Sequence, residues 1–389
     1  MRKKLDLLDV KILEGLGKYC PRNITEVAKK LNMPRGTLFS RMKTLSSSFY
    51  LRLFTNVYIT NLGLKKGVVF AKATPGDEDL LFNCMKVNKF YTYLSRCYGP
   101  FEGCVGIYAI PKDHTTKFEQ FVQEIKRLGV ACDVQILWST SFYTVNRTSN
   151  WFDSSSETWT FPWDKWVKEI QTEGTELPYT LVDPEGFPIK ADETDLFIIK
   201  ELEKDPTISL TAIANKLGTT LQNVSYHYNL HVIKNGLLEN FQVFIFPFDR
   251  TTSDTFFFTF KFDNTEKMAK FALSLLDKPF VNIVGKVLGE NTITAQVYLP
   301  RHEFRNFIDN LLKLIRAGFL QNYNYVIQDL RLGKWSRETI PYQFFKNGVW
   351  VYNHSRHIKN LHDLFNKRTR VDILTSSKNE MLRNLFLNR

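Results

Sequence analysis

A cluster of small, polar and basic side chains between residues 34 and 47 offers the clearest chemistry in this chain. Leu38, Met42 and Leu45 recur at helical spacing, so they predict a helix that buries one stripe of side chains. The opposite face would carry the candidate contact residues Arg35, Gly36, Thr37, Ser40, Arg41, Lys43 and Thr44. Small side chains let a helix approach the major groove of DNA, while Arg and Lys contact phosphate or guanine. We therefore expect this helix to bind double-stranded DNA, although three-helix modules also bind proteins.

The preceding residues predict two helices that would position this one. Apolar residues recur at helical spacing over 5–16 and 24–31, and Asn23 suits the N-cap of the second helix. Pro34 suits the first turn of the third helix. The run 49–59 has the β-branched and aromatic content of a wing or a linking strand. This order of elements predicts a winged helix-turn-helix.

A second arrangement of elements follows this module. The sequence predicts strand 67–73, helix 77–87, strands 90–97 and 103–110, helix 115–128 and strand 132–137. Phe118, Phe121, Val122 and Ile125 fall on one face of the second of these helices, and Gly129 suits its C-terminal cap. The order β-α-β-β-α-β is that of the ferredoxin-like sandwich.

The chain repeats these features at a constant offset. The block 6–13 returns at 192–199 and the block 27–31 returns at 213–217, so both blocks are displaced by the same number of positions. Gly99 falls on Gly285 at the same offset. A repeat of this size is a whole module, because solenoid repeats are only about 20–50 residues long. We infer a tandem duplication, with a second winged helix-turn-helix and a second ferredoxin-like domain.

The second helix-turn-helix has diverged from the first. Its third helix, over 221–232, carries Gln222, Asn223, Tyr226 and His227 as candidate contacts to DNA or to a partner. Residues 191–240 contain 4 Lys and 7 acidic residues, which gives a net charge of −3. Phosphate contacts dominate DNA affinity and an acidic surface opposes them. We therefore expect this module to pack against a partner or to contribute weakly to DNA binding.

Charge is placed unevenly along the 389 residues, whose net charge is +12. Residues 1–55 and 331–389 each hold 12 basic and 4 acidic residues, which gives +8 at each end. Two basic ends predict a polyanionic partner that is contacted at specific places. No apolar run reaches the length of about 20 residues that spans a bilayer. Five Cys without a C-x-x-C pair predict reduced thiols, so we expect a cytoplasmic protein.

These signals predict an α+β fold in which two winged helix-turn-helix modules are each followed by a ferredoxin-like βαββαβ domain, with a basic C-terminal extension. The expected boundaries are 1–60 and 191–248 for the two helix-turn-helix modules, 66–140 and 254–331 for the two ferredoxin-like domains, and 332–389 for the basic extension. Residues 141–190 are expected to be a Trp-containing linker that docks on the sheets. The tail holds His354, His357 and His362, but no Cys or clustered carboxylates accompany them, and we expect neither metal nor cofactor. Its basic residues suit a helical phosphate-contacting arm or a solvated helix face.

The combination of the opening helix 5–13, the helices over 24–45 and the hairpin 99–111 resembles the archaeal-type Lrp/AsnC family of transcription regulators. The resemblance covers about residues 5–140 and 192–330. It implies an N-terminal helix-turn-helix, a βαββαβ effector and assembly domain, and a homodimer formed through the βαββαβ domains. It also implies a small-molecule effector near a glycine-started turn, for which Gly99, Glu102 and Gly285 are the matching candidates.

Three functions are compatible with these observations. We expect a sequence-specific DNA-binding transcription regulator rather than an enzyme, because no phosphate loop, nucleophile elbow or zinc-protease motif is present. Siroheme decarboxylases also pair Lrp-like units and are the alternative that binds a tetrapyrrole. The third function is that of a scaffold that binds DNA without sequence preference or senses a ligand.

Overall fold

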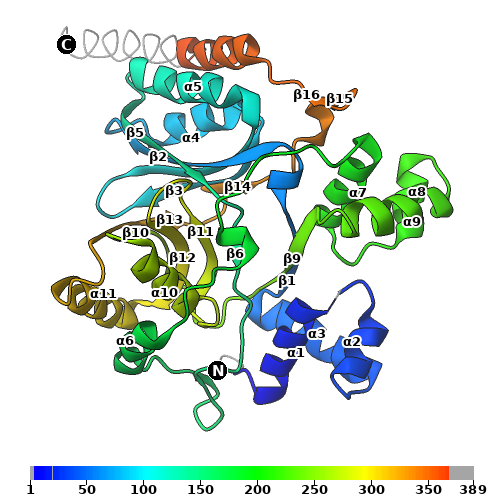
Figure 1. Cartoon of the computed structure of the whole chain (residues 1–389), viewed down its shortest axis with the longest axis vertical. Helices are drawn as coiled ribbons and strands as arrows, with labels where there is room; N and C mark the ends of the chain where they lie inside the picture. Colours follow the sequence, from blue (N-terminus) through cyan, green and yellow to red (C-terminus); the bar gives the residue numbers. More distant parts are fainter. Residues whose placement is uncertain (1–3, 20, 368–389) are drawn as a thin grey trace, which may run out of the picture.

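The computed structural model describes residues 4–19 and 21–367, and it confirms an α+β protein (Figure 1). Two βαββαβ units form its centre. The first consists of β2 (Leu64–Ala73), α4 (Glu78–Val87), β3 (Tyr91–Tyr98), β4 (Gly103–Pro111), α5 (Thr115–Arg127) and β5 (Ala131–Ser139). The second consists of β10 (Ser253–Lys261), α10 (Thr265–Leu275), β11 (Val281–Lys286), β12 (Thr292–Pro300), α11 (Arg301–Arg316) and β13 (Asn322–Asp329).

The two units join edge to edge into one ten-stranded sheet. Its main path runs β5-β2-β4-β3-β13-β10-β12-β11-β6, where β6 is Tyr143–Thr144. β3 and β13 pair antiparallel at the junction, with Ile327 opposite Tyr98. At the far edges a bridge between Ser139 and Val287 brings the ends of β5 and β11 together. The rings of Phe70 and Phe257, one from each unit, pack edge to face with centroids 5.7 Å apart, so the units share a core.

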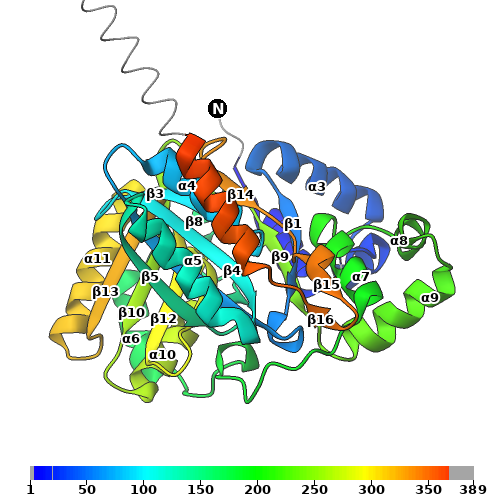
Figure 2. The ribbon, with the colours of Figure 1, turned by 90° about the horizontal axis from the view of Figure 1, so that it is seen from above.

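Two three-helix units lie beside this sheet (Figures 1 and 2). The first contains α1 (Leu7–Lys18), α2 (Ile24–Lys30) and α3 (Arg35–Phe49). The second contains α7 (Glu193–Lys204), α8 (Leu210–Leu217), α9 (Leu221–Tyr226) and a π-helical segment, His227–Ile233. β1 (Arg52–Val57) follows the first unit and β9 (Leu238–Phe244) follows the second, and these two strands pair with each other. The run predicted as a wing therefore links both helical units.

The helical units are part of the hydrophobic core. Leu13 and Leu38 of the first unit share one cluster of buried side chains with Phe258 of the second βαββαβ unit. Leu196 and Val224 of the second helical unit belong to a cluster with the first βαββαβ unit. Each helical unit thus shares a core with the βαββαβ unit of the other half of the chain. Neither can be removed without exposing apolar surface.

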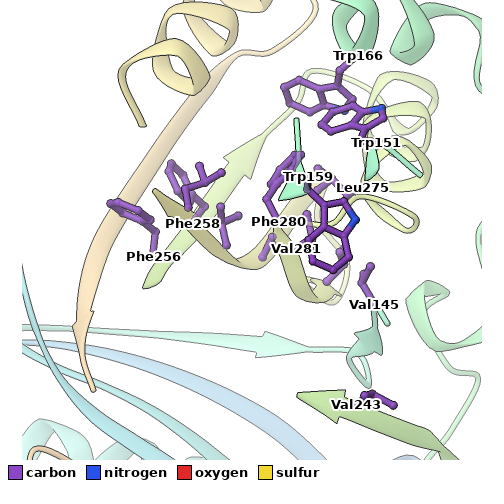
Figure 3. Packing of buried hydrophobic residues seen from close by; sticks show 14 of the residues in the cluster. Val145, Trp151, Trp159, Trp166, Val243, Phe256, Phe258, Leu275, Phe280 and Val281 are labelled. Carbon is purple, nitrogen blue, oxygen red and sulfur yellow. The ribbon is translucent and has the colours of Figure 1, made fainter. Parts of the chain in front are cut away.

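The Trp-containing segment docks on the second βαββαβ unit, as Figure 3 shows. It forms β7 (Phe152–Asp153), β8 (Thr158–Trp159) and α6 (Trp163–Thr172). The Trp166 side chain is fully buried, stacks on Phe307 with ring centroids 5.7 Å apart, and packs against Phe271 and Phe280. Its indole N–H donates to the Ser274 hydroxyl. The aromatic composition of this segment is explained by this packing.

The C-terminal segment packs on the first βαββαβ unit. β14 (Trp335–Arg337) pairs with β3, and β15 (Phe345–Lys346) pairs with β16 (Val349–Trp350). Residues 354–367 are helical and lie along α5 (Figure 2). His357 is buried beside Phe90, whereas His362 contacts Glu124, so these two tail histidines do not converge. The part of the predicted basic arm beyond residue 367 lies outside the described residues.

Candidate nucleic-acid interface and adjoining cleft

The ends of α3 are set by its flanking residues. Pro34 precedes the helix with φ −60°, and Tyr50 ends it in the left-handed conformation with φ 60°. Leu38, Leu45 and Phe49 are buried and fix the inner face. The exposed side chains of the helix therefore lie on the side away from the core.

Most of the predicted contact residues of α3 are exposed together. Arg35, Gly36, Thr37, Ser40 and Lys43 are exposed, and Thr44 is half-buried. Among the described residues, neither Arg35 nor Lys43 has an ion-pair partner. A Cβ added at Gly36 would meet no atom within 4 Å, so the backbone is open to solvent there.

Phe39 lies on the same face and is absent from the residues that the sequence pattern predicts there. It is 67% exposed, although an aromatic ring in a helical pattern normally indicates a core position. The signal that could have identified it is its neighbour Leu38, which already occupies the inward position. An exposed aromatic ring on a recognition face is suited to apolar contact with a thymine methyl group.

Arg41 is held within the first helical unit. Its Nη1 lies 2.5 Å from Oδ2 of Asp6 and 2.9 Å from Oδ1 of Asp9, and Asp6 and Asp9 also form the capping box of α1. Burial acts to raise the pKa of Asp6, but hydrogen bonds, first that from Arg41, outweigh it and the pKa is lowered. The guanidinium thus ties α3 to the start of α1.

The candidate residues of the second unit also comprise exposed side chains and one side chain that contacts the first helix of its unit. Gln222 and Asn223 are exposed on α9, and Tyr226 is 53% exposed. His227 is turned toward α7, where its Nδ1 lies 2.8 Å from Oδ1 of Asp195. The offset that carries block 6–13 onto 192–199 also carries Arg41 onto His227. Both side chains contact the carboxylate pair that caps the first helix of their unit.

His231 completes a compact group with these side chains. Its Nδ1 lies 3.2 Å from Oδ2 of Asp195 and 4.0 Å from Oδ2 of Asp192, and the rings of His227 and His231 are 4.7 Å apart. Burial raises the pKa of Asp195, whose side chain is 1% exposed, although hydrogen bonds to the charged form oppose the rise. The sequence does not reveal this group, because its carboxylates and its imidazoles lie in separate helices.

The outer face of the second unit carries exposed apolar side chains beside its polar ones. Leu221, Leu230 and Ile233 are each between 43% and 48% exposed on α9 and the segment after it. These side chains offer no phosphate contact.

The residues predicted to form an effector turn are separated in the fold. Gly99 has φ +114° at the turn between β3 and β4, and Glu102 is exposed beside it. Gly285 lies within β11 opposite Thr294, where the Phe142 ring fills the space of a Cβ. The corresponding hairpin turn of the second unit contains Gly289 instead, because the second hairpin departs by a few positions from the constant offset.

A partly open cavity of about 370 Å³ lies between the sheet and the β1–β9 ribbon. Tyr50, Phe54 and Phe244 form part of its wall, and Lys66 and Glu239 also line it. Burial lowers the pKa of Lys66 and raises the pKa of Glu239.

Glu203 is half-buried and lines the same cavity. It accepts a hydrogen bond from the Ile340 backbone N–H at 2.7 Å. Burial raises its pKa to about 7, against the effects of this hydrogen bond and of Arg337. The cavity therefore holds two carboxyls, Glu203 and Glu239, that take up protons more readily than a solvated carboxyl does.

A wider cleft of about 660 Å³ adjoins this cavity at Phe246 and Arg250. Its lining includes the four arginines Arg96, Arg250, Arg301 and Arg331. Three of these arginines, Arg96, Arg301 and Arg331, form ion pairs, with Asp79, Asp254 and Asp329 respectively. The cleft lies where β3 meets β13, so both βαββαβ units contribute to it.

Part of this fold matches a known protein family and known structures. The winged helix-turn-helix DNA-binding family matches residues 192–229, which lie in the second helical unit. No curated protein matches the chain. An AsnC family transcriptional regulator from Agrobacterium tumefaciens covers 34% of the chain and 89% of its own length, with 15% identity and a TM-score of 0.28.

A whole-chain match comes from an enzyme. The siroheme decarboxylase NirDL covers 93% of this chain and 99% of its own, with 12% identity and a TM-score of 0.50. Its complex with an iron-uroporphyrin III analogue covers 92% and 98%, with 11% identity and the same TM-score. The expectation of a protein that is not an enzyme is therefore contradicted, because the whole fold resembles that of an enzyme. The expectation rests on the absence of a phosphate loop, a nucleophile elbow and a zinc-protease motif, and these motifs belong to only a few reaction types.

No helix among the residues that the structure describes is both long enough and apolar enough to cross a membrane.

Proposed function

We propose that this chain is a sequence-specific DNA-binding transcription regulator of the Lrp/AsnC type that reads the major groove with α3. The observation that carries the proposal is the exposed face of α3, where Arg35 and Lys43 flank Gly36 and Ser40. This helix belongs to a segment, residues 1–55, with a net charge of +8. The winged helix-turn-helix match at 192–229 supports the assignment, because that segment contains the two blocks that correspond to 6–13 and 27–31 of the first unit.

The positions of these side chains suggest different roles. Residues near the N-terminus of a recognition helix contact base edges, so we assign Arg35 to a base contact. Lys43, two turns later, is assigned to a phosphate. Arg41 acts as a positioning residue, since its guanidinium is engaged by Asp6 and Asp9.

The second helical unit plays a different part in this proposal. Its net charge of −3 over residues 191–240 and its exposed apolar side chains favour contact with a partner over contact with phosphate. Gln222 and Asn223 remain candidates for a weaker DNA contact. The β3 and β13 edges are joined within one chain, so a homodimer with two basic units would use other surfaces of the βαββαβ domains. Such a dimer would suit a palindromic operator.

Salt-dependent binding tests the roles of Arg35 and Lys43. The full chain would be titrated with an operator duplex over a series of salt concentrations. Lys43→Ala is expected to reduce the slope of log affinity against log salt by about 1, equally for all sequences. Arg35→Ala is expected to cost about 1–3 kcal/mol and to relax specificity at one base pair. Lys234→Ala, an exposed lysine of the acidic second unit, is the matched control and should change neither quantity.

A second candidate function is binding of a polyanionic ligand in the cleft between the βαββαβ units. The observation that favours it is the set of four arginines around the cleft, in a fold shared with a protein that was crystallised with an iron-uroporphyrin III analogue. The ligand would be an effector in a regulator or a substrate in a siroheme-decarboxylase-like enzyme. Glu102, at the turn that starts with Gly99, also lines this cleft.

Binding of iron-uroporphyrin III to the purified chain tests this candidate. A visible absorption change that saturates and is weakened by Arg250→Ala, but not by Arg305→Ala on the exposed face of α11, would support it. Altered DNA affinity in the presence of the ligand would mark an effector, and mass loss from the ligand would mark a decarboxylase. Unchanged spectra would exclude this ligand from the cleft.

A further inference from the structure

Two carboxylates and two imidazoles converge in the second helical unit at a place that the proposed function does not use. Asp192 and Asp195 come from the start of α7, and His227 and His231 come from the segment that follows α9. One ligand atom from each of the four residues lies within 4.8 Å of all the others. Carboxylate oxygen and imidazole nitrogen are ligands that zinc accepts.

The separations of these atoms resemble the edges of a coordination tetrahedron. Zinc bonds of about 2.0–2.2 Å place tetrahedral ligand atoms about 3.4 Å apart. Nδ1 of His231 lies 3.2 Å from Oδ2 of Asp195, and Nδ1 of His227 lies 3.6 Å from Oδ2 of Asp192. Nδ1 of His231 lies 4.0 Å from Oδ2 of Asp192, and Nδ1 of His227 lies 2.8 Å from Oδ1, the other carboxylate oxygen of Asp195. Small shifts of these side chains would therefore centre an ion.

The backbone positions both imidazoles for this purpose. His227 and His231 are one helical turn apart and share one face of the helix. The helix changes from α to π at His227, and π segments frequently occur at functional sites. The ring of Tyr226 packs edge-on against both imidazoles, with centroids 5.7 Å and 5.3 Å away, and so restricts their rotation.

The carboxylates are oriented by a second layer of contacts. Asp192 Oδ1 accepts a hydrogen bond from the Asp195 backbone N–H at 2.9 Å, and Asp195 Oδ2 accepts one from the Asp192 backbone N–H at 3.0 Å. Such contacts fix metal-binding carboxylates in known sites. The Asp195 side chain is 1% exposed and the Asp192 side chain is 45% exposed, so an ion would enter from the side of Asp192.

The first helical unit has a permanent cation at the position that His227 occupies in the second unit. There the corresponding carboxylates, Asp6 and Asp9, are neutralised by Arg41, a permanent cation. The equivalent of Arg41 in the second unit, at the constant offset of the repeat, is His227. An imidazole is not a permanent cation as a guanidinium is, whereas a divalent ion would supply two positive charges and bind all four side chains.

We propose that Asp192, Asp195, His227 and His231 form a structural zinc site that joins the start of α7 to the helix after α9. Four protein ligands leave no open position, which is typical of structural and not catalytic zinc. The ion performs in the second unit the bridging that Arg41 performs in the first. This proposal departs from the sequence-based expectation of no metal, which rests on the three histidines of the tail alone.

The test is metal binding by the full chain after treatment with a chelator. Zn²⁺ binding would be measured by calorimetry and Co²⁺ binding by the visible absorption of the tetrahedral ion. We expect one equivalent per chain, an absorption band typical of nitrogen and oxygen ligands, and a rise in Tm on zinc addition. His231→Gln and Asp192→Asn should abolish the band, and asparagine preserves the helix cap. His302→Gln, a 77% exposed histidine on α11, is the matched control and should bind as the wild type does.

A substitution that copies the first unit provides an independent check. His227→Arg is expected to abolish metal binding while keeping a Tm close to that of the zinc-loaded wild type, because the guanidinium replaces the ion. No binding by the wild-type chain at micromolar zinc would overturn the proposal. Binding that is undiminished in both His231→Gln and Asp192→Asn would overturn it too, since the ion would then lie elsewhere, for instance at the exposed thiol of Cys132.

Discussion

Arg41 and Lys43 are near neighbours on α3, yet the structure predicts opposite consequences for their loss. Arg41→Met keeps the apolar stem of the side chain but removes both ion pairs with Asp6 and Asp9. The Asp9 side chain is 3% exposed and would lose its cation, whereas the Asp6 side chain is 43% exposed and partly solvated. Breaking a buried pair costs about 3–5 kcal/mol and an exposed pair about 0–1 kcal/mol. Because the Arg41 side chain is itself 33% exposed, we expect an intermediate loss of about 2 kcal/mol in the free energy of unfolding.

The pH dependence of this loss follows from the lowered pKa of Asp6. A carboxyl whose pKa is lower in the folded state adds stability above its unfolded pKa, near 3.8, and loses it as the pH falls through the folded pKa. The difference between wild type and Arg41→Met should therefore be present at neutral pH and shrink below about pH 4. Urea unfolding followed by circular dichroism at several pH values measures it.

Lys43→Met is the matched control for this comparison. Lys43 is exposed and has no ion-pair partner among the described residues, so its loss should change the free energy of unfolding by less than about 0.5 kcal/mol. It should instead reduce the salt slope of DNA binding by about 1, a slope that Arg41→Met leaves unchanged under conditions where it is folded. An Arg41→Met chain as stable as the wild type, with a reduced salt slope, would refute this division of roles.

Three further substitutions test other parts of the structure. Gly36→Ala should stabilise α3 by about 0.5–1 kcal/mol, because the added Cβ meets no atom within 4 Å. The same Cβ should weaken DNA binding by holding the helix away from the groove, so unfolding and DNA titration of one sample measure the two effects. Trp166→Ala should cost about 3–5 kcal/mol, since the ring is fully buried against the second βαββαβ unit; an unchanged urea midpoint would contradict that packing. Burial raises the pKa of Glu203 to about 7, so the folded state retains a proton that the unfolded state loses, and stability falls as the pH rises from about 4.5 to 7. Glu203→Gln keeps the hydrogen-bond acceptor for Ile340 and should remove this fall, which unfolding measured over that pH range would show.

The order of elements is accessible from the sequence because local patterns determine it. The helix expected over 115–128 is α5 (Thr115–Arg127), with Phe118, Phe121, Val122 and Ile125 buried as expected. The strand expected over 103–110 is β4 (Gly103–Pro111). Their spacing and apolar faces are properties of adjacent residues, which one sequence contains in full.

The pairing of distant segments is not accessible in this way. Nothing local indicates that β1 pairs with β9 or that Trp335 returns to β3. The same limit applies to the candidate site, where helical spacing assigns Arg41 to DNA because it falls at the edge of the outer face. Its partners within the chain, Asp6 and Asp9, belong to the start of a different helix, and spacing does not predict them. Spacing alone likewise equates Gly285 with Gly99, although Gly285 lies inside a strand.

Selection from a pool of random duplexes, at near-physiological salt, tests the central claim most directly. The wild-type chain would be compared with Arg35→Ala as full-length proteins, since residues of α1 and α3 belong to the core and a truncation would expose it. We expect the wild type to enrich a palindromic sequence and Arg35→Ala to lose the preference at one position of each half-site. Enrichment of no sequence by the wild type, or an identical motif for both proteins, would contradict it.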